Sequence, residues 1–159
     1  MSETPVLDKV IKNVRVVRPH KDAIELLDLG IKDGKFAQIA PNINPDTGKE
    51  VFDGKNLLGF PGVVDAHMHI GIYQPLDKDA VTETKAAAMG GVTTSLNYIR
   101  TGQYYLNKGG SYRDFFPEVL ALSAGNFFVD YSYHIAPIAS QHIDEIPLLF
   151  EEHGVSSFK

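Results

Sequence analysis

The first third of the chain alternates apolar and polar residues in short runs, which turn-forming residues separate. The runs are rich in β-branched residues and none has the period of a helix, so the pattern predicts strands. The predicted strands are residues 9–17, 23–31 and 36–39. A hairpin turn is expected at Asp33-Gly34, a loop at 42–49 and another turn at Asp53-Gly54. Residues 1–58 are therefore predicted to form a small β-rich domain of the β-sandwich type.

The pattern changes at residues 59–62, after which strand-like and helix-like segments alternate. β-Branched runs indicate the strands, and Ala-rich or apolar segments bounded by capping and stop residues indicate the helices. Strands are predicted at 63–69, 92–99, 127–138 and 155–158, and helices at 77–89, 115–124 and 143–153. Ser111 and Asp114 are expected to form a capping box for the second helix, and Gly154 to end the third.

This alternation implies a parallel sheet with right-handed crossovers. Four strands are half of a (β/α)8 barrel, which needs about 250 residues. An open doubly wound sheet is the alternative, but four strands without a Gly-rich phosphate loop make a poor example of it. The predicted fold class is therefore α/β, with residues 59–159 as the first half of a TIM-like barrel. Since no helix follows the last strand, the chain is expected to be truncated and to continue beyond Lys159.

Composition narrows the function classes. Hydrophobic residues make up 43% of the chain and charged residues 22%, as is typical of globular proteins. The net charge of −5 is scattered, and without a basic stripe nucleic acid is not an expected partner. With no apolar run of about 18 residues, a membrane is not expected either, and the cytoplasm is the expected location. The lack of cysteine leaves histidine, carboxylate or a modified lysine to hold any metal.

The segment Asp65-Ala66-His67-Met68-His69 carries the clearest chemical signal. Side chains two residues apart on a strand share a face, so His67 and His69 are expected to point the same way. At the end of the first strand of a barrel, that face is where catalytic residues lie. Neutral imidazoles bind zinc and similar cations, whereas an isolated His-x-His more often consists of ordinary exposed or buried histidines. The strand context favours a metal site.

Several motifs occur in an order that resembles the cyclic amidohydrolases. They are VIKN at 10–13, IKDGK at 31–35, GFPGVVDAHMH at 59–69 and GGVTT at 90–94. The closing GVSSFK at 154–159 resembles the fourth-strand segment of hydantoinases and dihydropyrimidinases. The resemblance covers nearly the whole chain, and its specificity comes from the order and spacing of the motifs.

The resemblance implies that His67, His69 and Lys159 are metal ligands. It also implies two divalent metal ions, with zinc expected, and a carbamate formed from CO2 on Lys159 that bridges them. A free lysine, with a pKa near ~10.4, is a cation that would repel a metal, whereas its carbamate is an anion with two oxygens. Composition alone would instead favour a solvated, unmodified lysine.

The implied activity is hydrolysis of a cyclic amide, such as a hydantoin or a dihydropyrimidine, by a hydroxide that bridges the two metals. The catalytic Asp and two further His ligands of the family lie beyond residue 159, so no catalytic base is assigned here. Tyr73, Asn97 and Tyr98 are expected to contact the small-molecule substrate. By analogy with the family, the protein is expected to be a homo-oligomer, with a tetramer as one form.

Other residues leave alternatives open. His134 is expected either beside the metal site or in the core, and Tyr104 and Tyr105 either in the pocket or over apolar surface. The remaining histidines are expected in surface turns or helices: His20, His142 and His153. Gly71 stands where dihydroorotases have Arg and allantoinases commonly Asn, which disfavours a dihydroorotase, although Arg100 could bind an anion instead. The rival functions are a non-catalytic scaffold of the same fold, another amidohydrolase such as an allantoinase, or a β-rich binding module.

Overall fold

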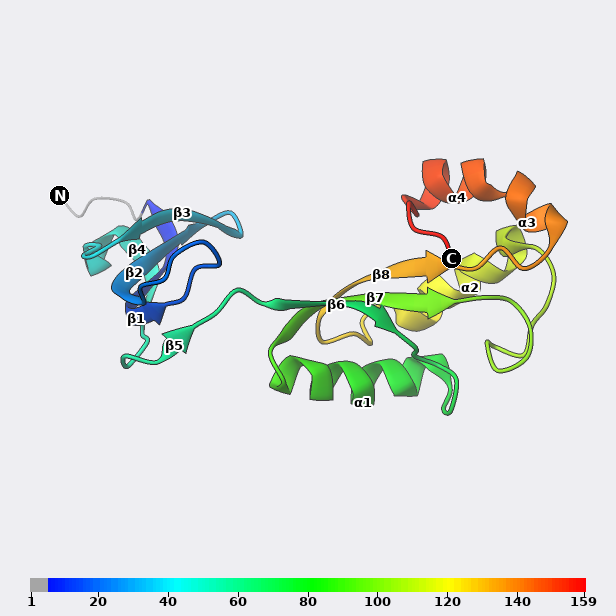
Figure 1. The fold of residues 1–159 in the computed structure, drawn as a ribbon, viewed down its shortest axis with the longest axis horizontal. Helices are drawn as coiled ribbons and strands as arrows, with labels where there is room; N and C mark the ends of the chain where they lie inside the picture. The colour runs from blue at the N-terminus through cyan, green and yellow to red at the C-terminus, as the bar shows by residue number, and fades with distance from the viewer. Residues whose placement is uncertain (1–5) are drawn as a thin grey trace. The chain divides into compact units, whose positions relative to one another are not determined.

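The computed structural model describes residues 6–159, which form two compact units with their boundary between Pro61 and Gly62 (Figure 1). The change in sequence pattern placed this boundary three residues earlier, between 58 and 59. Each unit has its own sheet and its own buried core, and each is described separately below. No helix within the described residues is long and apolar enough to cross a bilayer.

The first unit is a five-stranded sheet with one short 3-10 helix. Its elements are β1 (Leu7–Val16), β2 (Glu25–Lys32), β3 (Lys35–Ala40), η1 (Pro45–Thr47), β4 (Gly48–Asp53) and β5 (Leu58–Gly59). β2 and β3 are antiparallel neighbours on one side of β1, while β4 and β5 pair with β1 in parallel. The predicted hairpin is confirmed, because Asp33 and Gly34 join β2 to β3 with φ angles of 50° and 72°.

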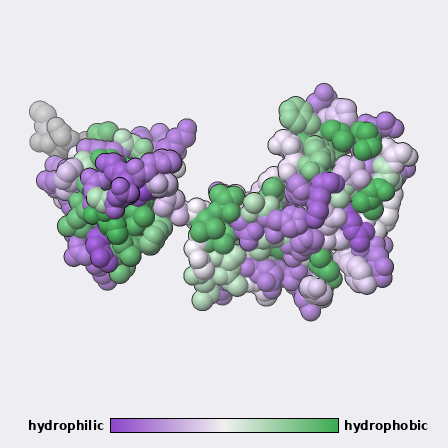
Figure 2. Space-filling view, in the orientation of Figure 1, coloured by the Kyte–Doolittle hydropathy of each residue, from purple (hydrophilic) through white to green (hydrophobic). Residues whose placement is uncertain are grey.

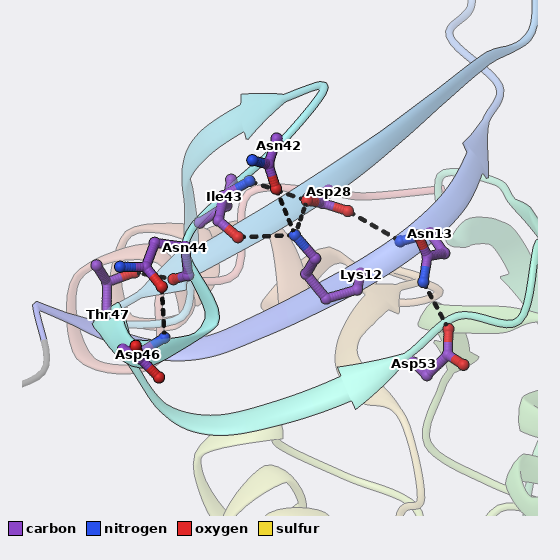
Figure 3. Close-up of polar contacts among 9 residues, drawn as sticks. All are labelled: Lys12, Asn13, Asp28, Asn42, Ile43, Asn44, Asp46, Thr47 and Asp53. Atoms are coloured by element: carbon purple, nitrogen blue, oxygen red, sulfur yellow. Dashed lines mark hydrogen bonds and ion pairs between the residues drawn. The ribbon is translucent and has the colours of Figure 1, made fainter.

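A buried ion pair ties this unit together (Figure 3). Asp28 is 3% exposed, and it accepts hydrogen bonds from the backbone amides of Asn13 and Ile43, both at 2.9 Å. Lys12 Nζ lies 2.5 Å from the same carboxylate and also donates to the Asn42 side chain and the Ile43 carbonyl. The carboxylate thus joins β1, β2 and the loop that follows β3.

The second unit has a three-stranded parallel sheet in the order β6-β7-β8, so the predicted parallel pairing is confirmed. Its elements are β6 (Val63–Met68), α1 (Leu76–Met89), β7 (Val92–Ile99), α2 (Tyr112–Ser123), β8 (Asp130–Ile135), α3 (Ser140–Asp144) and α4 (Ile146–His153). The helices and one face of the sheet share a buried cluster, formed by Leu76, Ala80, Ile99, Phe115, Phe116, Val119, Tyr133, Ile135 and Leu149.

Three predictions about the last third of the chain are wrong. The single helix expected at 143–153 is two helices that meet at Glu145. Pro147, in the first turn of α4, has no N–H to bond back to the preceding turn, so α3 cannot continue through it. The strand expected at 127–138 is shorter, and the one at 155–158 is a single parallel bridge between Ile135 and Phe158.

The N-terminus of α2 is capped differently from the prediction. Ser111 is the cap, as expected, and its hydroxyl accepts a hydrogen bond from the Arg113 amide at 3.0 Å. The carboxylate at this helix end comes from Glu145 rather than Asp114, and it accepts from the Tyr112 amide at 2.9 Å. Glu145 lies at the junction between α3 and α4, outside both helices, and from there its carboxylate caps α2.

His142 is another correction. It was expected on the surface, but it is 2% exposed and both ring nitrogens form hydrogen bonds. Nδ1 accepts from the backbone amides of Ile138 and Ala139, and Nε2 donates to the Gly110 carbonyl at 2.9 Å. His142 therefore fastens the segment after β8 to the segment before α2.

Both units leave apolar side chains at their surfaces, which Figure 2 shows as patches among the polar residues. Phe36 on β3 and Phe60 are exposed in the first unit. In the second unit Val63 and Val64 are exposed, because β6 pairs on one side only. Among the described strands, β6 is thus an edge strand of its sheet.

Candidate active site

A cluster of polar and aromatic side chains lies where the parallel strands of the second unit end. Its members are His67 and His69 from the end of β6, Tyr98 from β7, His134 from β8, and Lys159. The carboxyl ends of parallel strands meet at the same edge of a sheet, so residues far apart in sequence come together there. Tyr98 and His134 occupy directly paired positions of β7 and β8.

His67 and His69 point toward each other. Their Nε2 atoms are 3.1 Å apart, and their rings lie 5.0 Å apart at 73°. Met68, between them in sequence, packs against the buried cluster on the opposite side. Two nitrogens that each bind one zinc ion at about 2.0–2.1 Å cannot be more than about 4.2 Å apart. The observed separation therefore fits two ligands of one metal.

Lys159 completes this group although it is 92 positions from His67. Its Nζ lies 3.4 Å from His67 Nε2 and 4.9 Å from the centre of the Tyr98 ring. Its backbone is fixed to the sheet, since the Lys159 amide donates to the Ile135 carbonyl at 2.9 Å. The side chain is therefore directed by β8 toward the two histidines.

Hydrogen bonds to neighbouring side chains fix the Nδ1 atoms of His69 and His134. His69 Nδ1 lies 3.0 Å from the Tyr105 hydroxyl, and His134 Nδ1 bonds the Ser157 hydroxyl. The His134 ring is 5.7 Å from the His67 ring, which places it beside the pair rather than in the core. Of the two positions considered for His134, the structure has the one next to the cluster.

The cluster disfavours additional positive charge. Burial, then the neighbouring His67 and Lys159, lower the pKa of His69 below its ordinary value. Burial, His67 and Lys159 lower the pKa of His134 in the same way. Both imidazoles are therefore neutral at pH 7, which is the form that binds a metal. Burial raises the pKa of Tyr105 to about 12, so its phenol also stays neutral.

The three residues expected to contact substrate lie in different places. Tyr98 is within the cluster, 4.7 Å from the His69 ring. Tyr73 is 90% exposed and lines a pocket of about 400 Å³ between the loops that follow β6 and β7. Asn97 is 1% exposed, and its side-chain amide donates to Ser95 and to the Ser132 carbonyl. Its side-chain oxygen has no hydrogen-bond partner among the described atoms.

Within the described residues, the set of side chains that could bind a metal is incomplete. No group of three or more His, Cys, Asp or Glu side chains in residues 6–159 could hold a metal ion. His67 and His69 supply two such side chains, and Lys159 Nζ lies 3.4 Å from His67 Nε2. The other histidines differ: His20 is exposed in the first unit, and His153 packs on Phe116.

Two partners of the cluster were not identified from the sequence. Ser157 was expected only as part of a strand, and Tyr105 was left between two roles. Their side chains become relevant through contacts with His134 and His69, which are 23 and 36 residues away. No spacing rule along the chain links such pairs. The adjacent tyrosines at 104 and 105, next to a predicted strand end, were the available signal.

Comparisons with known proteins relate the chain to hydantoinases. No protein-family model matches the chain. It is 34% identical over 158 residues to a D-hydantoinase of Geobacillus stearothermophilus and 36% identical over 156 residues to a D-phenylhydantoinase of Escherichia coli. These alignments cover 96% and 94% of this chain but 32% of each relative, so the chain spans about a third of their length.

Solved structures give the same result. A crystal structure of a D-hydantoinase matches with a TM-score of 0.76 and 30% identity, over 94% of this chain and 32% of that one. An L-hydantoinase (dihydropyrimidinase) from Arthrobacter aurescens matches with a TM-score of 0.74 and 26% identity, over 96% and 32%. The comparisons support a relationship between this chain and the cyclic amidohydrolase family. The resemblance predicted from the sequence motifs is thereby confirmed, and the mixed α/β fold corresponds to the N-terminal part of hydantoinase structures.

Proposed function

We propose that this chain belongs to a metal-dependent enzyme that hydrolyses a cyclic amide, such as a hydantoin or a dihydropyrimidine. The observation that carries the proposal is the 3.1 Å approach of His67 Nε2 and His69 Nε2, with Lys159 Nζ 3.4 Å from His67. The likeness to D-hydantoinase and D-phenylhydantoinase over 94–96% of the chain supports the reaction class. Metal dependence is consistent with that family.

His67 and His69 would hold one divalent cation, and zinc suits their neutral imidazoles. When bound, divalent metals polarise a carbonyl and lower the pKa of water, which is the chemistry that amide hydrolysis needs. The role of the chain is to keep both Nε2 atoms unprotonated and convergent. The low pKa of His69 supports this role, because a protonated ring has no lone pair for a metal.

Lys159 would serve as a bridging ligand after its Nζ has reacted with CO2 to give a carbamate. Starting from the ammonium ion, the reaction forms an N–C bond and releases two protons, one before and one after the amine attacks CO2, and it changes a cation into an anion with two oxygens. The 3.4 Å contact between Lys159 Nζ and His67 Nε2 supports this role, since the amine lies where it can reach the pair.

The substrate would enter from the solvent side of the strand ends. Tyr98 lies over the Lys159 amine and beside both histidines, so its ring would line the site. Tyr73 would contribute from the adjacent pocket. Asn97 would contribute its side-chain oxygen, which has no hydrogen-bond partner among the described atoms. In a complete (β/α)8 barrel, these strand ends would form part of the mouth. A homo-oligomer remains part of the proposal by analogy with the family.

The test is a double replacement, His67→Ala with His69→Ala, in the full-length protein. Metal content measured by elemental analysis, and hydrolysis of a hydantoin and of a dihydropyrimidine, should both be lost. His20→Ala is the matched control, since that residue is an exposed histidine of the first unit and should change neither quantity. A double variant that keeps its metal would overturn the site. A wild-type protein that binds metal but hydrolyses neither ring would favour a non-catalytic relative.

A further inference from the structure

We propose that Tyr105 is a positioning residue that sets the tautomer and ring orientation of His69. It would do so by accepting a hydrogen bond from His69 Nδ1–H, so that the Nε2 lone pair faces His67. The inference rests on the metal site proposed above and assigns it a partner that the sequence left undecided. It starts from the 3.0 Å contact between the Tyr105 hydroxyl and His69 Nδ1.

The direction of this hydrogen bond follows from the requirements of the site. A neutral imidazole carries one proton, so a metal can bind Nε2 only if the proton is on Nδ1. Nδ1–H then needs an acceptor, and the phenol oxygen of Tyr105 is at hydrogen-bond distance. Outer partners of this kind keep ligand histidines in one tautomer and one orientation. The phenol does this without adding charge beside Lys159.

The loop that carries Tyr105 has an unusual backbone conformation on both sides of this residue. Tyr104, Leu106 and Asn107, which flank it, have φ angles of 72°, 51° and 48°. Non-glycine residues adopt this left-handed conformation at a cost, and runs of it persist only where surrounding contacts enforce it. Here the enforcing contacts are local. Gly102 and Lys108 form a bridge, and the Tyr104 amide donates to the Asn107 side chain at 3.1 Å.

The phenol is also fixed from its sides. Tyr105 is 3% exposed, its ring meets Tyr98 edge-on at 5.7 Å, and the Arg100 guanidinium lies 5.0 Å from its centre. A side chain that only covered apolar surface would not need its hydroxyl on a ring nitrogen. Tyr104, the adjacent tyrosine, is 56% exposed and forms no hydrogen bond with a histidine among residues 6–159. The two neighbours therefore form a natural pair for a test.

The experiment compares Tyr105→Phe with Tyr104→Phe in the full-length protein, because each removes one hydroxyl and keeps the ring. In metal-free protein, nitrogen-15 NMR of the histidine rings reports the tautomer. Wild type and Tyr104→Phe should hold His69 as the Nδ1–H form, and Tyr105→Phe should lose that preference. Zinc affinity, measured by competition with a chromophoric chelator, should fall about 10–100-fold in Tyr105→Phe and stay unchanged in Tyr104→Phe.

His69→Ala separates the two levels of the proposal. If His69→Ala loses zinc while Tyr105→Phe keeps wild-type affinity and tautomer, the role of Tyr105 is overturned and the metal site stands. If wild type binds no zinc, or His69→Ala binds it as wild type does, the proposed function fails and the inference fails with it. A parallel fall in affinity and loss of the tautomer in Tyr105→Phe alone would establish the positioning role.

Discussion

The two units use buried and clustered polar groups in opposite ways. In the first unit, the Asp28 carboxylate has all its partners within the protein, since two backbone amides donate to it and Lys12 forms an ion pair with it. In the second, His67, His69 and Lys159 face one another at an open sheet edge, with ring nitrogens and an amine that share few other partners. Removing one partner of a satisfied buried pair leaves an unpaired charge and destabilises the fold, whereas convergent ligand atoms at strand ends leave capacity to bind a metal or substrate. In this chain, the polar groups whose hydrogen bonds are all made within the protein are structural, and the convergent groups with few partners are the candidates for function.

The largest expected effect is on the open cluster. Replacing Lys159 by Ala or by Arg in the full-length protein should lower hydrolysis of a hydantoin by more than about a hundredfold, because several kcal/mol of metal-derived stabilisation are lost. Arg keeps a positive charge but cannot form the carbamate, so it should not rescue. Rates and bound metal would be measured together. Activity near wild type in Lys159→Arg would show that a carbamate is not needed.

The closed pair should respond in stability instead. Asp28→Ala leaves Lys12 without its main counter-charge and two buried amides without an acceptor. The free energy of unfolding should fall by about 3–5 kcal/mol, measured by urea denaturation. Asp8→Ala breaks a more exposed pair with Lys49 and should lower the free energy of unfolding much less. Equal losses in the two variants would remove the distinction drawn between a closed pair and a surface pair.

Acid should weaken the same pair. Burial alone would raise the pKa of Asp28, but the hydrogen bond from Lys12, the amides of Ile43 and Asn13 and the Lys12 charge lower it overall. A carboxyl with a lowered folded-state pKa stabilises the protein above its unfolded pKa of about 3.9. That contribution is lost as pH falls through the lower folded pKa. Unfolding profiles of wild type and Asp28→Asn should therefore converge below about pH 4. A difference that stays constant down to pH 2 would exclude this linkage.

The smallest expected effect is at the cap of α2. Ser111→Ala removes the hydroxyl that accepts from the Arg113 amide, and should cost about 1 kcal/mol in unfolding free energy. Glu145 still accepts from the Tyr112 amide and keeps the loss small. Thermal or urea unfolding would measure it. A loss above about 3 kcal/mol would mean that Ser111 does more than cap a helix.

Local patterns predicted much of the fold. The strand at 92–99 and the hairpin at Asp33-Gly34 were found because alternation and turn chemistry act within a few residues. The single helix at 143–153 was wrong, since the effect of Pro147 at that point was underestimated. His142 was misjudged because its acceptor, the Gly110 carbonyl, is 32 residues away. Long-range partners leave no periodic trace in a sequence.

The site divides in the same way. The i, i+2 spacing on a strand was enough to predict that His67 and His69 point together. Lys159 was predicted as a ligand from the resemblance and from its position at a strand end, because a lysine carries no pattern of its own. The role of Tyr105 could not be decided, since it depends on three left-handed residues around it that no propensity scale predicts. The position of the Tyr105 hydroxyl could therefore not be predicted, because an irregular loop determines it.

The 92-residue separation of His67 and Lys159 has a consequence for the order of events during folding. The histidine pair lies within one strand and its end, so it can form early, whereas the lysine must wait for β8 and the segment after α4 to dock. Contacts of long sequence separation form late because loop closure must precede them. During synthesis, a ribosome would present the two histidines well before the lysine. The contact between His67 and Lys159 can therefore form only after β6, β8 and the segment after α4 have come together, and a chain that ends before Lys159 cannot make it.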